Sequence, residues 1–430
     1  MSTQHRIPGL ALTDHEYRVP LDHGNAKRGE ITVFAREVVA IDKLDLPLPW
    51  LVFLQGGPGY EAPRPLTNSG WLKRALQEFR VVLLDQRGTG RSTPVHGASV
   101  LRIGDPEAQA AYLACFRQEQ IIRDCEWIRR RLCGESTKWT VLGQSWGGYL
   151  ATHYLSVAPE GLEAALFTGG LPPLTATADD VYRATYRRTA SRNARYFERY
   201  PEDRELLRHL LRRVGRGDVR LSNGDPLTPR RVQQLGMVFG MSDGFETVHY
   251  LLEGAFLERA SSAENDALQP AFLLDIERSS TFERNPIYAL LQEAIYAHGS
   301  ATRWSADRIR GVFPEFDDLE TPLFTGEMVY PWMFDEMKAL VPMREAAHLL
   351  AERTDWGQVY DPARLRENTV PAAAAIYTDD LYVEARYSED AAATIRGLRP
   401  WITNEYDHNG LRADGEKILD RLLGLARGAV

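Results

Sequence analysis

Residues 138–150, KWTVLGQSWGGYL, place a serine between two apolar segments. Residues 139–142 predict a buried strand, and residues 149–155 predict a helix. Between them GQSWG (143–147) matches the pattern G-x-S-x-G, which puts a serine on a sharp strand-to-helix turn with its hydroxyl clear of the sheet. Glycine is expected on both sides because a Cβ there would clash with neighbouring backbone. The stretch predicts that Ser145 is a nucleophile; the alternative is an ordinary glycine-rich connection.

The bulk composition narrows the class of protein. The chain has 430 residues, of which 44% are apolar, and a net charge of −8 without a long basic tract, which argues against a nucleic-acid partner. The N-terminal segment lacks the apolar core of a secretory signal, and no apolar run approaches the roughly 20 residues that span a bilayer. Cys115, Cys125 and Cys133 lack C-x-x-C spacing, so we expect free thiols in a cytoplasmic protein and no metal site. The alternative is a disulfide between two of them. The sequence gives no indication of oligomeric state.

The order of predicted elements indicates an α/β fold. Residues 1–30 are polar and rich in turn formers, and strands are predicted at 31–40, 50–54 and 80–84. A helix over 105–133 precedes the serine turn, and a strand over 162–167 follows it. Further strands at 370–377 and 400–404 and a helix at 411–426 complete the chain. This alternation predicts a mostly parallel sheet covered by helices on both faces.

The pattern of predicted elements changes at residue 172. No clear buried strand is found between 179 and about 341, whereas helices are predicted within 181–216, 239–256 and 289–298. We therefore expect a core first part at 1–171, an inserted helical cap at 172–355, and a core second part at 356–430. The many arginines of 181–216 are expected on a solvated face with i,i+4 partners.

Two glycine-rich loops follow predicted strands. The segment QGGPG (55–59) has bare backbone N–H groups after a buried strand, which suits the second half of an oxyanion hole; alone it would be a plain turn. The segment DQRGTGRS (85–92) is interpreted as a structural turn in which Asp85 and Arg87 hold loops by charge-assisted hydrogen bonds.

A serine hydroxyl needs a base within hydrogen-bond reach and an acid that orients the base. His408 is the only histidine after the candidate acids and follows the last predicted strand. Either Asp379 or Asp380 follows the preceding strand, and the pattern does not separate these neighbours. The order serine, aspartate, histidine is that of α/β-hydrolases.

Three motifs together resemble the proline iminopeptidases, which are α/β-hydrolase serine peptidases: GGPG at 56–59, DQRGxGxS at 85–92 and GQSWGG at 143–148. The resemblance covers about residues 1–170 and 360–430, whereas the cap matches loosely. It aligns the family's acid with Asp380, although Glu384 replaces a proline. Gln55, Gln144 and Asp407 also depart from the family's usual residues, which leaves substrate preference open.

The resemblance implies a mechanism and a small peptide substrate with a free N-terminus. Ser145 would attack the carbonyl of the N-terminal residue, His408 would carry the proton, and Asp380 would fix the imidazole tautomer. The N–H groups of Gly57 and Trp146 would stabilise the oxyanion. No cofactor is implied.

Carboxylates near the serine would bind the protonated amine. The resemblance places these in the cap, where the candidates are Glu246, Glu253 and Glu327. The last lies among aromatic residues, where a carboxylate is costly unless it is paired. Two alternatives are a hydrolase acting on other N-terminal residues, amides or esters, and a non-catalytic binding protein of the same fold. The second is disfavoured because every catalytic position is filled.

Overall fold

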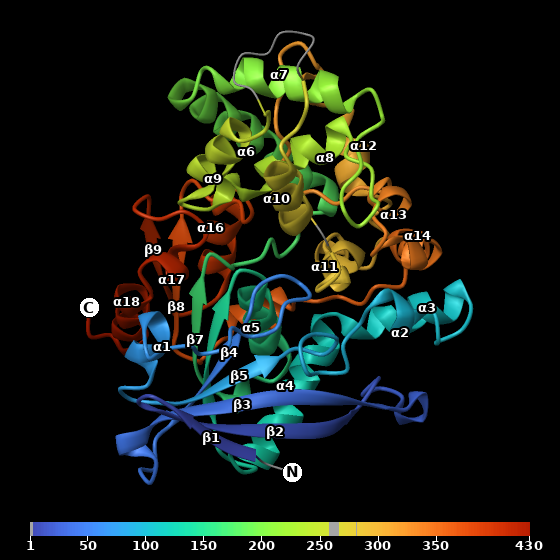
Figure 1. Cartoon of the computed structure of the whole chain (residues 1–430). Helices are drawn as coiled ribbons and strands as arrows, with labels where there is room; N and C mark the ends of the chain where they lie inside the picture. The colour runs from blue at the N-terminus through green and yellow to red at the C-terminus, as the bar shows by residue number, and fades with distance from the viewer. Residues whose placement is uncertain (1–2, 258–265, 281) are drawn as a thin grey trace.

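The computed structural model describes residues 3–257, 266–280 and 282–430. In this part of the chain nine strands form one sheet in the order β1-β2-β3-β5-β4-β6-β7-β8-β9 (Figure 1). Neighbouring strands from β5 to β9 pair in parallel, whereas β1, β2 and β3 pair antiparallel at one end. The strands are β1 Thr3–Ile7, β2 Leu10–Pro20, β3 Glu30–Ala40, β4 Trp50–Leu54, β5 Arg80–Asp85, β6 Trp139–Gln144, β7 Leu162–Thr168, β8 Ala372–Tyr377 and β9 Leu398–Thr403.

The polar N-terminal segment was wrongly expected to consist of turns. It forms β1 and β2, and β2 pairs with β3 over its whole length. Its apolar residues, such as Leu10 and Val19, are buried, while Asp14 binds Arg36 of β3 at 2.7 Å. A cross-strand ion pair of this kind stabilises an antiparallel pair. The many polar residues of β2 obscure the alternation of apolar and polar residues that would predict a strand.

Helices cover both faces of the sheet. On one face α1 Gly70–Ala75 and α18 Gly415–Arg427 pack together against the strands, and on the other lie α4 Gln118–Leu132 and α5 Trp146–Val157. The helix expected over 105–133 is interrupted: α3 Pro106–Leu113 and α4 are separated by a 3₁₀ turn, η3 Ala114–Phe116. The remaining core helices are α2 Gly97–Val100, α15 Pro362–Arg366, α16 Ala385–Thr394 and α17 Gly410–Ala413.

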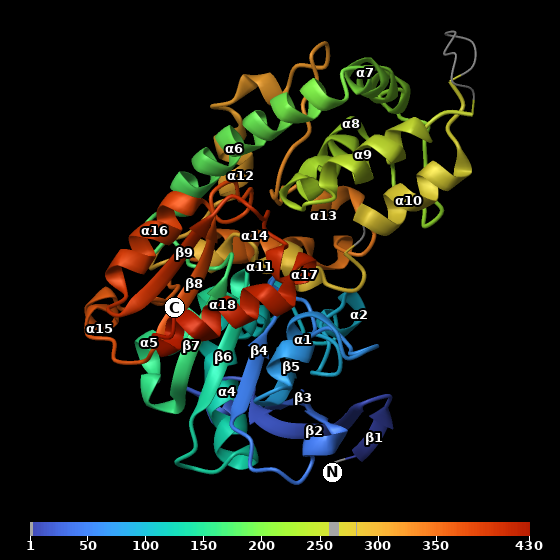
Figure 2. The ribbon, with the colours of Figure 1, turned by 90° about the vertical axis from the view of Figure 1, so that its left-hand side faces the viewer.

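A group of helices stands over the carboxyl ends of the parallel strands (Figures 1 and 2). Between 179 and 341 the described residues contain only two isolated β-bridges and no strand, as expected for this segment. Residues 258–265 and 281 of the expected cap lie outside the described residues. The helices are α6 Ala178–Arg199, α7 Asp203–Val214, α8 Pro229–Gln233, α9 Gly244–Glu253, α10 Pro270–Ser280, α11 Pro286–Leu291, α12 Ser305–Arg310, α13 Met333–Glu336 and α14 Arg344–Glu352, with the 3₁₀ segment η5 Gln234–Gly240.

Two further expectations are confirmed. Arg87 is buried and binds both carboxylate oxygens of Asp124 as well as three backbone carbonyls, so the turn after β5 is structural. The three cysteines are free. No helix in the described part of the chain is long and apolar enough to cross a membrane.

Candidate active site

Ser145 lies on a strained turn between β6 and α5. Its φ of 54° and ψ of −127° are unfavourable for a residue with a side chain, at a cost of about 1–3 kcal/mol. The flanking glycines permit this geometry: a Cβ on Gly147 would lie 1.9 Å from the carbonyl oxygen of Leu54, and one on Gly143 would lie 2.4 Å from that of Gly147. The steric reason expected from G-x-S-x-G therefore holds.

Asp380 and His408 lie together beyond β8 and β9. His408 Nδ1 is 2.7 Å from Asp380 Oδ2, while Asp380 Oδ1 accepts backbone N–H bonds from Tyr382 and Val383. Burial lowers the pKa of His408, but the adjacent Asp380 carboxylate outweighs it, and the net pKa lies above the ordinary value. The ring of Tyr382 packs edge-on against the imidazole at 4.7 Å between centroids. This arrangement orients an imidazole through a buried carboxylate, as a general base requires.

The neighbouring aspartate lies elsewhere. Asp379 pairs with Arg195 at 3.0 Å on the surface, and its side chain is half exposed. The structure thus brings Asp380, and not Asp379, to His408.

The loop 55–59 lies against the serine. A Cβ on Gly56 would stand 2.8 Å from the Cβ of Ser145, and Gly57 has a φ of 136° that favours glycine. The carbonyl of Gln55 accepts a hydrogen bond from Gln86 Nε2 at 2.8 Å, which ties the loop to the turn after β5. Trp146 begins α5, where the first backbone N–H groups lack acceptors within the helix. Gly57 thus lines the same cavity as Ser145, and Trp146 follows Ser145 as the first residue of α5.

A cavity of about 410 Å³ joins these residues to the helices above them. Ser145, His408 and Gly57 line it, and so does Glu327. Tyr288 Oη donates to Glu327 Oε1 at 2.7 Å. Burial raises the pKa of Glu327 to about 7, although the Tyr288 hydrogen bond and the charge of His408 oppose the shift. A carboxylate held this way is ready to pair with a bound cation.

The other two glutamates are not brought to the cavity. Glu246 binds Arg199 at 2.6 Å and the hydroxyl of Tyr200 at 3.1 Å. Glu253, at the end of α9, has an exposed side chain. Neither is among the residues that line the cavity, so their expected position beside the serine is not found.

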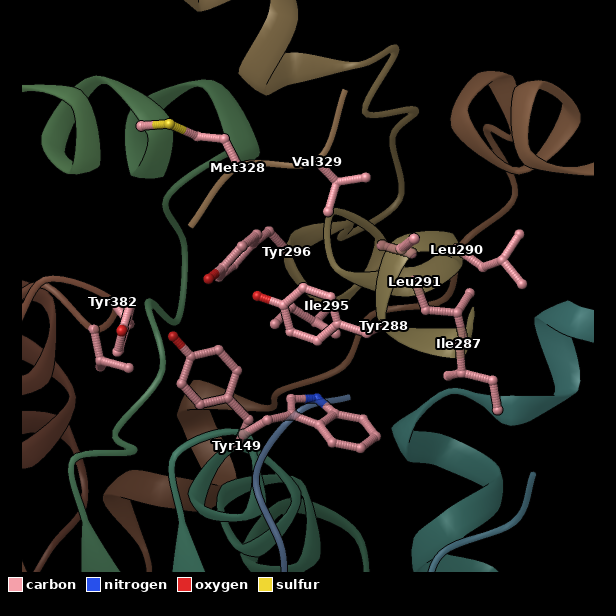
Figure 3. Packing of buried hydrophobic residues seen from close by; sticks show 14 of the residues in the cluster. Tyr149, Ile287, Tyr288, Leu290, Leu291, Ile295, Tyr296, Met328, Val329 and Tyr382 are labelled. Carbon is pink, nitrogen blue, oxygen red and sulfur yellow. The ribbon is translucent and has the colours of Figure 1, made fainter. Parts of the chain in front are cut away.

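A group of tyrosines around Glu327 was missed by the sequence interpretation. Figure 3 shows Tyr149, Tyr288 and Tyr296 with their hydroxyls turned toward a common space. The Glu327 carboxylate, after burial, contributes to raising the pKa of Tyr149 and Tyr296, which places it near them. These residues come from α5, α11 and the turn after α11, so no local pattern connects them.

The expected solvated face is found for Arg183 and Arg195 of α6, whose side chains are 40% and 52% exposed, but the expectation is wrong for Arg188 and Arg192. Arg192 is buried and bonds to Asp407 and to the carbonyl oxygen of Asp379. Arg188 pairs with Glu384 at 2.7 Å. The partners of Arg188 and Arg192 lie on loops that are distant in sequence, so an i,i+4 pattern within the helix does not predict them.

The chain is similar to known proteins over most of its length. A family model described as the alpha/beta hydrolase fold matches residues 49–290. A proline iminopeptidase of Aeromonas sobria is 48% identical over 424 residues, covering 98% of each chain. One from Aspergillus aculeatus is 33% identical over 98% of this chain and 95% of its own. The chain belongs to the proline iminopeptidase family. Among solved structures, esterase E22 is similar in fold, with a TM-score of 0.50 at 11% identity, covering 96% of this chain and all of that one.

The match to the Aeromonas sobria protein covers 98% of this chain, so the family resemblance extends through residues 172–355. The residues that depart from the family's usual motifs have defined surroundings. A Cβ on Gly56 would meet Gln144 Oε1 at 2.7 Å, so Gln144 packs against the glycine loop. Asp407, directly before His408, accepts from Arg192. Both departures lie beside the site and leave Ser145, Asp380 and His408 in place.

Proposed function

We propose that this protein is a serine aminopeptidase that releases N-terminal proline from small peptides. The observation that carries the proposal is Glu327, a buried carboxylate that lines the same cavity as Ser145 and His408. A protonated α-amine is the cation that such a carboxylate would bind, and it is the group that distinguishes an aminopeptidase substrate. The relatives named proline iminopeptidase support the choice of proline.

The mechanism follows from the roles of five groups. Ser145 Oγ attacks the carbonyl carbon of the N-terminal residue, and His408 takes the serine proton. Asp380, bonded to His408 Nδ1, stabilises the imidazolium that forms. The N–H groups of Gly57 and Trp146 bind the oxyanion, and each such donor is worth about 100- to 1,000-fold in rate. His408 then protonates the leaving amine, and water releases proline from the acyl-enzyme by the same steps in reverse.

The substrate is a peptide with a free N-terminus, because an N-acyl group would remove the charge that pairs with Glu327. The aromatic side chains beside Glu327, such as Tyr288, would pack against the pyrrolidine ring. The division into a core (1–171 and 356–430) and a cap (172–355) gives the cap the role of supplying this pocket. We assign the protein to the cytoplasm on the basis of its three free cysteines, which suit a reducing compartment.

The test compares proline, alanine and N-acetylproline p-nitroanilides. We expect turnover of the proline substrate, weaker turnover of alanine, and loss of activity on the blocked substrate. Ser145→Ala should abolish turnover of the proline and alanine substrates. Equal hydrolysis of free and blocked proline would overturn the aminopeptidase assignment, and activity surviving in Ser145→Ala would overturn the mechanism.

The two neighbouring aspartates offer a matched pair of variants. Asp380→Asn should lower kcat by about 10⁴-fold, because the amide favours the wrong imidazole tautomer. Asp379→Asn removes a surface ion pair and should change kcat by less than about threefold. The reverse ranking would mean that the acid is wrongly assigned.

A further inference from the structure

One arginine of the cap contacts both loops that carry the Asp380–His408 pair. Arg192 lies on α6, and its guanidinium side chain is only 6% exposed. Its Nη2 donates to the carbonyl oxygen of Asp379 at 2.5 Å and also to the carboxylate of Asp407. The first contact is one residue before Asp380, and the second is one residue before His408. A single planar guanidinium therefore joins the acid loop to the histidine loop.

Arg192 is not the only residue of α6 that contacts the loops after β8, because the helix runs along this side of the core. It begins near α16 and rises to the top of the cap (Figure 2). Arg188, one turn before Arg192, pairs with Glu384 at 2.7 Å, and Arg195 pairs with Asp379 at 3.0 Å. Arg188 is partly buried and Arg195 half exposed, whereas Arg192 is the one of the three that is buried. Buried charges require partners, and both partners of Arg192 are fixed to the catalytic loops.

We propose that Arg192 is a positioning residue that holds the acid and histidine loops in register and offsets the charge of Asp407 beside His408. The proposal rests on the proposed serine mechanism, since it concerns the geometry of its base. It also assigns a role to Asp407, which departs from the family's usual residue at this position: the aspartate receives the cap arginine.

The charges that face His408 determine in which direction its pKa should shift in each variant. Asp380 lies on the acid loop, Asp407 on its own loop, Glu327 in the cap segment above, and Arg192 on α6; the uncharged Tyr382 ring covers the imidazole. The three carboxylates favour the imidazolium, and Asp407 does so from the adjacent residue. Arg192 neutralises Asp407. Removing Arg192 alone leaves a negative charge, which should raise the pKa of His408, and removing Asp407 alone leaves a positive charge, which should lower it.

The readout is the rate at which a neutral fluorophosphonate modifies Ser145, measured against pH. In this reaction the serine oxygen bonds to phosphorus, fluoride leaves, and His408 takes the serine proton. The reagent has no amine, so its rate does not depend on amine binding at Glu327. Variants are Arg192→Gln, Asp407→Asn, the double variant, and Arg192→Lys, with Arg183→Met as a control. Arg183 lies on α6 but pairs with exposed Asp180.

The acid limb of the pH–rate profile should move to higher pH by roughly one unit in Arg192→Gln and to lower pH in Asp407→Asn. In the double variant it should return to near its wild-type position. The maximal rate in Arg192→Gln should fall by about 100-fold, as for a displaced catalytic group. Arg192→Lys should restore the acid limb but not the full rate, since the lysine side chain is one bond shorter than the path to Nη2, the atom that makes both contacts. Arg183→Met should behave as wild type.

A purely structural arginine would give another result. Equal limbs in all folded variants, or shifts of the same sign in Arg192→Gln and Asp407→Asn, would overturn the proposal. If Arg192→Gln fails to fold, Asp407→Asn and Arg192→Lys provide the test: an acid limb that does not move down in Asp407→Asn, or a full maximal rate in Arg192→Lys, would overturn the proposal. Failure of the wild-type serine to react at all would instead contradict the proposed function.

Discussion

Glu327 is the residue whose charge should control substrate recognition. Burial raises its pKa to about 7, so the carboxylate is largely protonated below that pH and ionised above it. Only the ionised form attracts a protonated amine, and KM for proline p-nitroanilide should therefore fall as the pH rises through about 7. Glu327→Gln should lower kcat/KM by about 100-fold or more at pH 8 and remove this transition. The measurement is steady-state kinetics from pH 5.5 to 9.

A second variant tests the same group without deleting it. The hydroxyl of Tyr288 donates to Glu327 and lowers its pKa against the effect of burial. In Tyr288→Phe the carboxylate loses this stabilisation, so the transition in KM should move to higher pH. A transition that persists in Glu327→Gln would assign the titration to another group.

For single residues, the sequence predicts the catalytic side chains better than the side chains that recognise the substrate. Ser145 lies in a local motif, and the position of His408 after the last strand follows from chain order. The three candidate glutamates could not be ranked, because their difference is spatial: Glu327 faces the cavity, whereas Glu246 turns to Arg199. The Tyr288 partner lies 39 residues from Glu327, beyond any local pattern.

The start of α12 offers a stability test at the scale of one element. Glu293 is buried, and its two carboxylate oxygens accept from the backbone N–H groups of Ser305 at 2.9 Å and Ala306 at 2.8 Å. Glu293→Ala would leave both donors without an acceptor and should lower the free energy of unfolding by about 1–3 kcal/mol. Glu293→Gln keeps one acceptor oxygen and should cost less. Urea unfolding of the two variants measures the difference.

The same carboxylate gives a pH dependence with a defined sign. Burial raises the pKa of Glu293 in the folded protein to about 7, against an ordinary value of 4.5. The folded state thus binds the proton more tightly, so this contribution to stability is complete below about pH 4.5 and is lost as the pH rises to about 7. The advantage of wild type over Glu293→Gln should shrink between pH 5 and pH 8. An advantage that grows with pH would show that the carboxylate is stabilised in its charged form.

The sequence predicted strands and helices well where their burial requires a simple pattern of apolar residues. Strands β6, β7 and β8 lie inside the sheet, and their continuous apolar runs predicted them closely. Strands β1 and β2 were missed because their polar faces are matched across an antiparallel pair. The periodicity predicted α6 but not the partners of Arg192, since two loops about 190 and 215 residues away provide them.

For the whole molecule, the order of strands and the change of texture at residue 172 predicted a hydrolase core with an inserted helical segment. The cavity between them was not predictable, because residues from both parts line it. Its upper wall comes from η5, α9 and the turn between them and is mostly apolar. The apolar lining residues are Leu235, Met237, Val238, Met241, Val248 and Leu251, and the polar ones are Gln234 and Thr247.

This wall predicts a preference for the second residue of the substrate. The wall lies on the His408 side, because the backbone N–H of His408 donates to the carbonyl of Gly240 at 3.1 Å and Tyr382 Oη donates to that of Met237 at 2.5 Å. His408 protonates the leaving amine, so the residue after the scissile bond should lie along the wall. Among the described lining residues there is no lysine or arginine to receive an acidic side chain.

Burying an apolar side chain there is worth about 1.5–3 kcal/mol, so kcat/KM for Pro-Phe-Gly-amide should exceed that for Pro-Asp-Gly-amide by at least about tenfold. Met241→Lys should narrow this ratio by improving the aspartyl peptide and weakening the phenylalanyl one, while leaving proline amide, which has no second residue, nearly unchanged. Release of proline from the three peptides, with Pro-Ala-Gly-amide as reference, measures the ranking. Equal kcat/KM values would mean that the leaving peptide does not lie along η5 and α9.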